Sequence, residues 1–226
     1  MALDPKYKAI GFDMDGTFMN TKVDYVKLAN VMFDEMVTMG VPESAINRTD
    51  GSKFELDSGL NWLIEHGREA DVYTIQGRVS KKATAVEMEN ADIAKPFNGA
   101  PEVLSLLKKK GYKVGILTRG GRAYAEHILR INGLYNEFDA IIARDDFPEE
   151  EAKPSPKAMY NLACALGVKP EEILFLGDHK FDWLTAKDSG AGFYGVLCGG
   201  YKADDWKKAG DNIETINGVK DLLNKI

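Results

Sequence analysis

The chain has few cysteines, no excess of basic charge and no long apolar run. Only two of its 226 residues are cysteine, Cys164 and Cys198, too few for a disulfide framework and typical of a reduced compartment. Cys164 stands in an apolar helical pattern, so we expect its thiol to be buried. No apolar run approaches membrane-spanning length, and the first residues carry no leader-like apolar segment. We therefore expect a cytoplasmic protein with no membrane partner.

The charge balance is acidic. The formal net charge is −6, and the sequence pI is about 5.2. Surfaces that bind nucleic acid carry clustered basic residues, so we expect no nucleic-acid partner. Hydrophobic residues make up 44% of the chain, which is enough for one large domain or for a core domain with an insert. We expect a monomer or a weak homodimer.

Two carboxylates follow the first apolar stretch of the chain. Residues 7–12 predict a short buried strand, and Asp13 and Asp15 come directly after it. Because side chains two residues apart on an extended chain point the same way, both carboxylates can face one small volume. Such carboxylates repel one another unless a proton or a cation compensates them, and oxygen ligands of this kind suit Mg²⁺. Gly16 permits a tight turn whose amides can hold an anion, although an acidic turn without a ligand is the alternative.

The residues after Thr17 change to helical character. Apolar residues recur at helical spacing, and we expect three helices, over residues 23–39, 54–64 and 78–88. No alternating strand pattern interrupts them. We therefore expect an all-helical domain over residues 20–95, inserted into an α/β core formed by residues 1–19 and 96–226.

From Pro96 onward strands and helices alternate. Strands are expected over residues 112–117, 138–143, 173–176 and 192–197, with helices between them. This alternation predicts parallel βαβ units and a doubly wound, Rossmann-like sheet. In such sheets ligands bind at the carboxyl ends of the strands. Polar residues stand at these ends here, namely Thr118, Asp178 and Asp182, with Lys153 on a loop before a helix.

Together these residues resemble the haloacid dehalogenase superfamily of phosphohydrolases. The Asp-x-Asp-Gly-Thr motif spans Asp13–Thr17, the Ser/Thr motif is Thr118, the lysine motif is Lys153 and the Gly-Asp-x-x-x-Asp motif spans Gly177–Asp182. The motifs occur in the family's order over roughly 150 core residues, which is more specific than any one motif. The helical insert lies where this family has its C1-type cap. Within the superfamily the chain is most similar to the phosphoglycolate phosphatase and β-phosphoglucomutase branch.

The resemblance implies a phosphatase that acts on a small phosphorylated metabolite through an aspartyl-phosphate. Asp13 would be the nucleophile, and Asp15 would act as general acid and then as general base. Thr118 would donate its hydroxyl to a phosphoryl oxygen, and Lys153 would offset the charge of phosphate and nucleophile together.

The resemblance also implies a Mg²⁺ cofactor. Asp13, the backbone carbonyl of Asp15 and Asp178 would hold the ion, with water completing its coordination. Further residues are expected to support these ligands or to lie near the substrate, namely Asp182, Gly16 and Thr17.

Two positions depart from the usual family pattern. Arg119 replaces a commoner asparagine or serine, and we expect it to contact phosphate or to pair with a local acid such as Asp145 or Asp146. His179 replaces a small hydroxyl residue, and we expect it to touch the substrate or to pack nearby. Neither departure changes the expected chemistry, but both bear on the choice of substrate.

Two alternatives to a phosphatase remain open at this point, and a third, a dehalogenase, is disfavoured more strongly. A phosphomutase would pass the phosphoryl group to a sugar phosphate, and a phosphate-sensing domain would keep the site without turnover. The presence of all the acids and of Lys153 disfavours a sensor. A dehalogenase needs neither Asp15 nor Asp178, so these two residues favour phosphorus chemistry.

Overall fold

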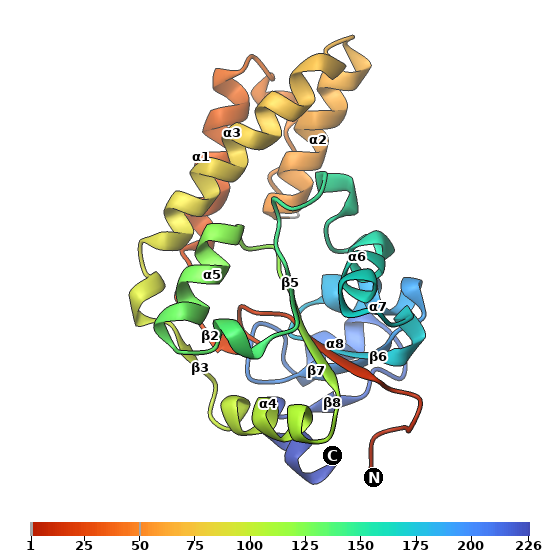
Figure 1. The fold of residues 1–226 in the computed structure, drawn as a ribbon. Helices are drawn as coiled ribbons and strands as arrows, with labels where there is room; N and C mark the ends of the chain where they lie inside the picture. The colour runs from red at the N-terminus through yellow and green to blue at the C-terminus, as the bar shows by residue number, and fades with distance from the viewer. Residues whose placement is uncertain (1, 50) are drawn as a thin grey trace. The chain divides into compact units, whose positions relative to one another are not determined.

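The chain divides into two compact units. The computed structural model describes residues 2–49 and 51–226. One unit joins the residues up to Thr21 to Ile93–Ile226, and the other comprises Lys22–Asp92. The first contains the main sheet and the second is helical (Figure 1). In the part of the chain that is described, no helix has both the length and the apolar character needed to cross a membrane.

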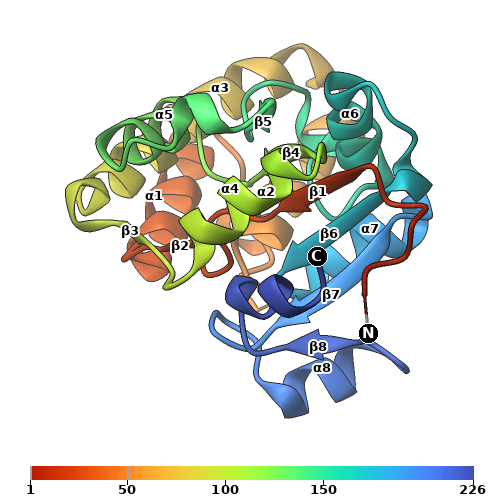
Figure 2. The same cartoon turned by 60° about the horizontal axis from the view of Figure 1, so that its bottom comes forward.

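A parallel sheet forms the centre of the first unit. Among the described residues it has six strands in the order β5-β4-β1-β6-β7-β8, and Figure 2 shows β1, β6, β7 and β8 side by side. Their bounds are β1 Ala9–Phe12, β4 Lys113–Leu117, β5 Ala140–Ile142, β6 Ile173–Gly177, β7 Gly192–Val196 and β8 Thr215–Ile216. The chain runs outward from β1 to one side of the sheet and returns to β6 on the other. The winding therefore reverses between β1 and β6, where doubly wound sheets bind ligands.

Helices pack on this sheet through apolar faces. Their bounds are α4 Ala100–Lys109, α5 Arg122–Ile131, α6 Pro156–Leu166, α7 Lys180–Ser189 and α8 Ala203–Ala209. Helix α6 begins where Ser155 caps it by accepting a hydrogen bond from Lys157 N, with Pro156 at its first position. Met159 and Leu162 of α6 then pack with Phe175 of β6 in one buried cluster. Burial of this apolar surface stabilises the sheet from which the polar strand ends project.

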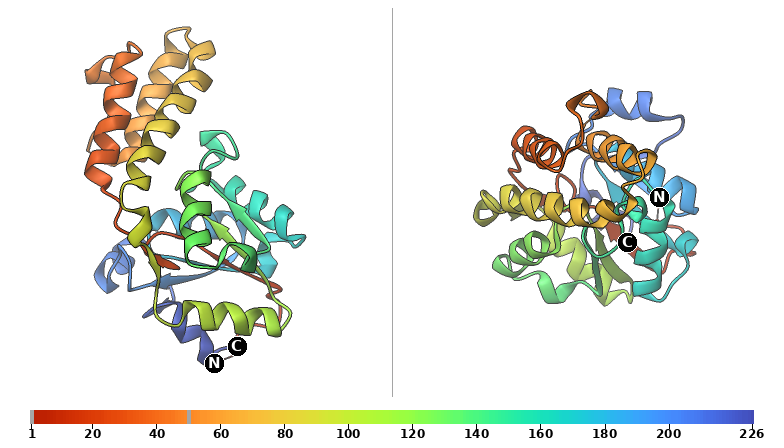
Figure 3. Two further views of the ribbon diagram at one scale, coloured as in Figure 1. Left: turned by 60° about the vertical axis from the view of Figure 1, so that its left-hand side comes forward. Right: turned by 90° about the horizontal axis from the view of Figure 1, so that it is seen from above.

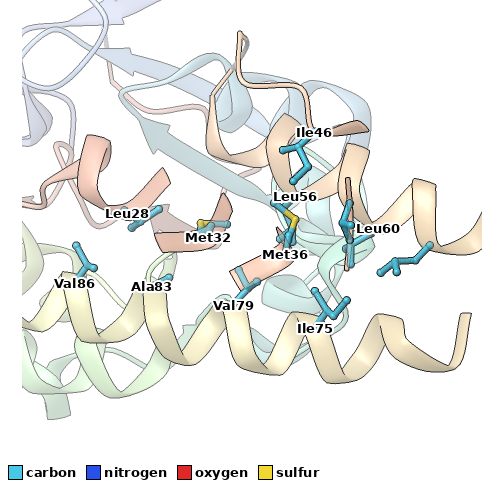
Figure 4. Close-up of a cluster of buried hydrophobic side chains, with 12 residues drawn as sticks. Leu28, Met32, Met36, Ile46, Leu56, Leu60, Ile75, Val79, Ala83 and Val86 are labelled. Atoms are coloured by element: carbon cyan, nitrogen blue, oxygen red, sulfur yellow. The ribbon is translucent and has the colours of Figure 1, made fainter. Parts of the chain in front are cut away.

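The second unit consists of α1 (Tyr25–Thr38), α2 (Ser52–Glu65) and α3 (Glu69–Met88), which run side by side (Figure 3). Figure 4 shows the buried side chains that fill the space between them. Helix α3 begins at Glu69, so the expected start at residue 78 was wrong. Ile75 and Val79 are buried one turn apart, but the exposed Gly77 between them obscured the pattern.

Several short elements were not expected. Strands β2 (Met19–Asn20) and β3 (Lys95–Pro96) pair antiparallel, and α8 and β8 extend the sheet unit beyond β7. The expected burial of Cys164 was wrong, because its side chain is exposed. Helix α6 buries Met159, Leu162 and Ala163 on one face, and Cys164 lies off that face.

Candidate active site

Three neighbouring strands deliver the expected polar residues to one edge of the sheet. Phe12 of β1 is in register with Ile116 of β4 and Leu176 of β6. Because all three strands are parallel, the residues that follow them leave the sheet at the same edge. Asp13 N donates a hydrogen bond to Leu176 O at 2.8 Å, which fixes the start of the first motif against β6.

Lys153 bridges two buried carboxylates at this edge. Its Nζ atom lies 2.6 Å from Asp13 Oδ1 and 2.5 Å from Asp182 Oδ1. Burial by itself would lower the pKa of Lys153, but Asp13 and Asp182 outweigh it and raise that pKa above its ordinary value. Asp182 is held in turn because its Oδ2 accepts a hydrogen bond from His179 N at 3.0 Å, at the first turn of α7. The ammonium group of Lys153 is therefore charged and fixed between the two acids.

The site holds more negative charge than Lys153 compensates. Oxygen atoms of Asp13, Asp178 and Asp182, one from each residue, all lie within 4.8 Å of one another. Burial raises the pKa of Asp13 well above its ordinary value, and the nearby acids raise it further against the opposing effect of Lys153. Burial, followed by the charge of Asp182, raises the pKa of Asp178 to about 6. A donor set of crowded carboxylate oxygens fits a hard divalent cation such as Mg²⁺.

A glycine-rich loop after β7 closes on Asp178. Gly200 N donates a hydrogen bond to Asp178 Oδ2 at 2.6 Å. A Cβ atom at Gly199 would lie 2.2 Å from Asp178 Oδ2, and one at Gly16, whose φ is +83°, would lie 2.1 Å from the same oxygen. Only glycine leaves room for the two backbone segments to approach this carboxylate so closely. The loop was missed in the sequence, where its signal was the pair Gly199-Gly200 at the end of an apolar strand.

Asp15 points to a different set of partners from Asp13. Its Oδ1 accepts a hydrogen bond from Tyr124 Oη at 2.7 Å, and its Oδ2 lies 3.5 Å from Thr118 Oγ1. The Thr118 hydroxyl also accepts a hydrogen bond from Gly120 N at 2.9 Å. Tyr124 was not expected at the site, because its place in the helix that follows Thr118 is that of an ordinary buried aromatic residue.

Arg119 supports the loop that carries Lys153. Its Nη1 donates to Lys153 O at 2.8 Å, and its Nη2 pairs with Glu149 Oε1 at 2.8 Å. Arg119 thus pairs with a local acid as expected, but that acid is Glu149 rather than Asp145 or Asp146. Those two acids bind Arg122 instead, Asp145 through the backbone N–H and Asp146 through the guanidinium group.

The contacts of His179 and the burial of Thr17 are those of residues that stabilise the fold. The Nδ1 atom of His179 accepts a hydrogen bond from Phe181 N at 3.3 Å and so caps α7, while its ring packs edge-on against Tyr201. Burial lowers the pKa of this imidazole. Thr17 is fully buried, and within the described part of the chain its hydroxyl has no hydrogen-bond partner.

Comparison with known proteins identifies the family. The model of the haloacid dehalogenase-like hydrolase family matches residues 10–196, so the chain belongs to this family. A phosphoglycolate phosphatase of Haemophilus influenzae is 25% identical over 200 residues, which cover 87% of this chain and 88% of that protein. Pyrophosphatase PpaX of Halalkalibacterium halodurans is 26% identical over 212 residues, 94% of this chain and 93% of that protein.

A solved structure agrees with this assignment. The crystal structure of a hydrolase from Pseudomonas syringae is similar with a TM-score of 0.64 and 25% identity, and the match covers 96% of each chain. The family and its phosphatase members make this protein a phosphoric monoester hydrolase. The resemblance expected from the motifs and the fold class expected from the alternation of strands and helices are thereby confirmed.

Proposed function

We propose that this protein is a cytoplasmic, Mg²⁺-dependent phosphatase of small phosphorylated metabolites, with phosphoglycolate as the first candidate substrate. The observation that carries the proposal is the contact of Lys153 with Asp13, beside the carboxylates of Asp178 and Asp182. This arrangement offers one carboxylate nucleophile and enough positive charge, once a divalent ion is present, for a phosphate dianion to approach it.

The residues in the site fit the proposed metal. Asp13 and Asp178 would hold Mg²⁺ together with the backbone carbonyl of Asp15, and Asp182 would support them through its contact with Lys153. When bound, Mg²⁺ would supply positive charge to the phosphoryl oxygens and to the nucleophile. Gly16 and Gly199 leave the space that the Asp178 carboxylate occupies, because a Cβ atom at either position would overlap with it.

The proposed reaction has two steps. A carboxylate oxygen of Asp13 attacks phosphorus, the bond from phosphorus to the leaving oxygen breaks, and Asp15 gives its proton to that oxygen. Water then attacks the aspartyl-phosphate while Asp15 takes a proton from it, and inorganic phosphate and free Asp13 result. Thr118 and Lys153 bind the phosphoryl oxygens in both steps.

We propose further that the helical unit, Lys22–Asp92, acts as a cap that selects the substrate. The sheet unit offers groups that recognise phosphate and metal, which leaves discrimination among metabolites to other residues. Deleting residues 20–95 with a short linker in their place should leave weak, unselective phosphatase activity. Selectivity that survives the deletion would assign recognition to the sheet unit.

Hydrolysis is favoured over phosphoryl transfer to a sugar because both relatives named above carry the names of phosphatases, a phosphoglycolate phosphatase and a pyrophosphatase. The test is a panel of phosphorylated metabolites, including phosphoglycolate and pyrophosphate, with p-nitrophenyl phosphate as a general substrate. EDTA should abolish phosphate release and added Mg²⁺ should restore it. Undiminished turnover in EDTA would contradict the proposed site.

A further inference from the structure

The hydroxyl of Tyr124 lies against the proposed general acid and base. Tyr124 is 1% exposed, and its Oη donates a hydrogen bond to Asp15 Oδ1 at 2.7 Å although the two residues are 109 positions apart in the chain. A buried tyrosine hydroxyl needs a polar partner, and here that partner is a reacting carboxylate.

The local structure is arranged so that this contact can form. Tyr124 lies on the buried face of α5, with Ala125 and Ile128. A Cβ atom at Gly120 would lie 3.0 Å from Tyr124 Cδ1 and 3.3 Å from Tyr124 Cε1. The absence of a side chain at Gly120 therefore leaves room for the tyrosine ring beside the loop that follows β4, where its hydroxyl reaches Asp15.

The contact leaves Asp15 little freedom. One carboxylate oxygen accepts from Tyr124, and the other lies 3.5 Å from the hydroxyl of Thr118. Proton transfer is efficient only when donor and acceptor are held in hydrogen-bond geometry toward the reacting oxygen. A carboxylate free to rotate would spend part of its time turned away from the leaving group or the attacking water.

We infer that Tyr124 is a positioning residue that orients the Asp15 carboxylate for proton transfer in both steps of the reaction. This inference rests on the proposed function. The role of Tyr124 would concern proton transfer by Asp15 and not attack by Asp13 on phosphorus. When the leaving group departs without a proton, that attack does not use Asp15. Loss of the Tyr124 hydroxyl should therefore slow proton-dependent steps and spare substrate binding.

The test compares Tyr124→Phe with the unmodified protein on two substrates. With p-nitrophenyl phosphate, whose leaving group needs no proton, the variant should keep the dissociation constant of the substrate and the rate of the first step, while the slower second step lowers kcat and KM together. Its phosphoenzyme should accumulate, because water attack is slowed. With phosphoglycolate, kcat should fall about tenfold or more with little phosphoenzyme, since the first step then needs the proton. Tyr160→Phe, on the exposed side of α6, is the matched control and should change neither quantity.

A double variant decides whether Tyr124 acts through Asp15. In an Asp15→Asn background, Tyr124→Phe should cause no further loss of activity. A further tenfold loss there, or an unchanged phosphoenzyme level and kcat in Tyr124→Phe alone, would overturn the inference while leaving the proposed function standing. Failure of the unmodified protein to release phosphate from any substrate would instead contradict the proposed function.

Discussion

The Nζ atom of Lys153 lies 2.6 Å from Asp13 Oδ1, with only 4% and 8% of the two side chains exposed. The lysine therefore supplies a positive charge that offsets the cost of burying the Asp13 carboxylate. A second contact, to Asp182, ties the same lysine to the first turn of α7. Stability and the proposed chemistry thus depend on one ammonium group.

Replacing Lys153 by methionine should lower both the stability of the fold and the phosphatase activity. The variant leaves buried acids without their cation, so the free energy of unfolding should fall by about 3–5 kcal/mol. The loss should be smaller in Mg²⁺ than in EDTA, because the ion supplies charge to the same carboxylates. Thermal unfolding in both buffers measures this. Lys157→Met removes an exposed lysine of α6 and is the control; equal stability of the two variants would contradict the account.

Arg119 should influence the reaction through Lys153. Arg119→Met removes the hydrogen bond to Lys153 O, so kcat should fall about tenfold as Lys153 loses its fixed position, with a small change in KM. Arg119→Lys should recover only part of the activity, because lysine cannot bind Lys153 O and Glu149 in the same forked geometry.

Steady-state kinetics of the Arg119 variants, with Arg130→Met as an exposed control on α5, measures this effect. A rise in KM alone, seen only for substrates that carry a carboxylate, would show instead that Arg119 contacts the substrate.

The pH dependence of stability should include a contribution from Asp139. Burial alone would raise the pKa of this acid, but hydrogen bonds from Val114 N and Lys113 outweigh it and hold the pKa below its ordinary value. A lowered pKa stabilises the fold above the unfolded value of about 3.9, and this stabilisation is lost as the pH falls through the folded pKa.

Asp139→Asn should therefore be less stable than the unmodified protein at neutral pH, by less than about 1 kcal/mol because the side chain is partly exposed. The difference should shrink below pH 4. Unfolding measured from pH 3 to 7 checks the sign, and a difference that grows in acid would contradict it.

The sequence predicted the strand ends better than the contacts between them. Asp13, Thr118 and Asp178 could be placed because each follows an apolar run, and parallel strands bring such ends together. The pairing of Arg119 with Glu149 could not be predicted. Glu149 lies in the segment between β5 and α6, and no periodic pattern in the sequence indicates the path of that segment. For the same reason the sequence could not show that Asp145 and Asp146, named as possible partners of Arg119, bind Arg122 instead.

Tyr124 was missed because its partner is set by tertiary packing. Its place on the buried face of α5 follows from helical spacing, and nothing local distinguishes it from an ordinary core aromatic residue. The close approach of Gly199 to Asp178 was hidden similarly, since a glycine pair in sequence indicates a turn without saying which side chain the turn covers.

The central claim is that Asp13 carries the phosphoryl group and Asp15 moves the proton. Intact-mass measurement after rapid mixing with p-nitrophenyl phosphate and Mg²⁺ tests it most directly on Asp13→Asn and Asp15→Asn. Asp15→Asn keeps the nucleophile and loses the base for the second step, so one added phosphoryl group should accumulate on it, located on Asp13 by peptide analysis. Asp13→Asn should show no adduct, and an adduct on Asp13→Asn or on neither variant would contradict the assignment.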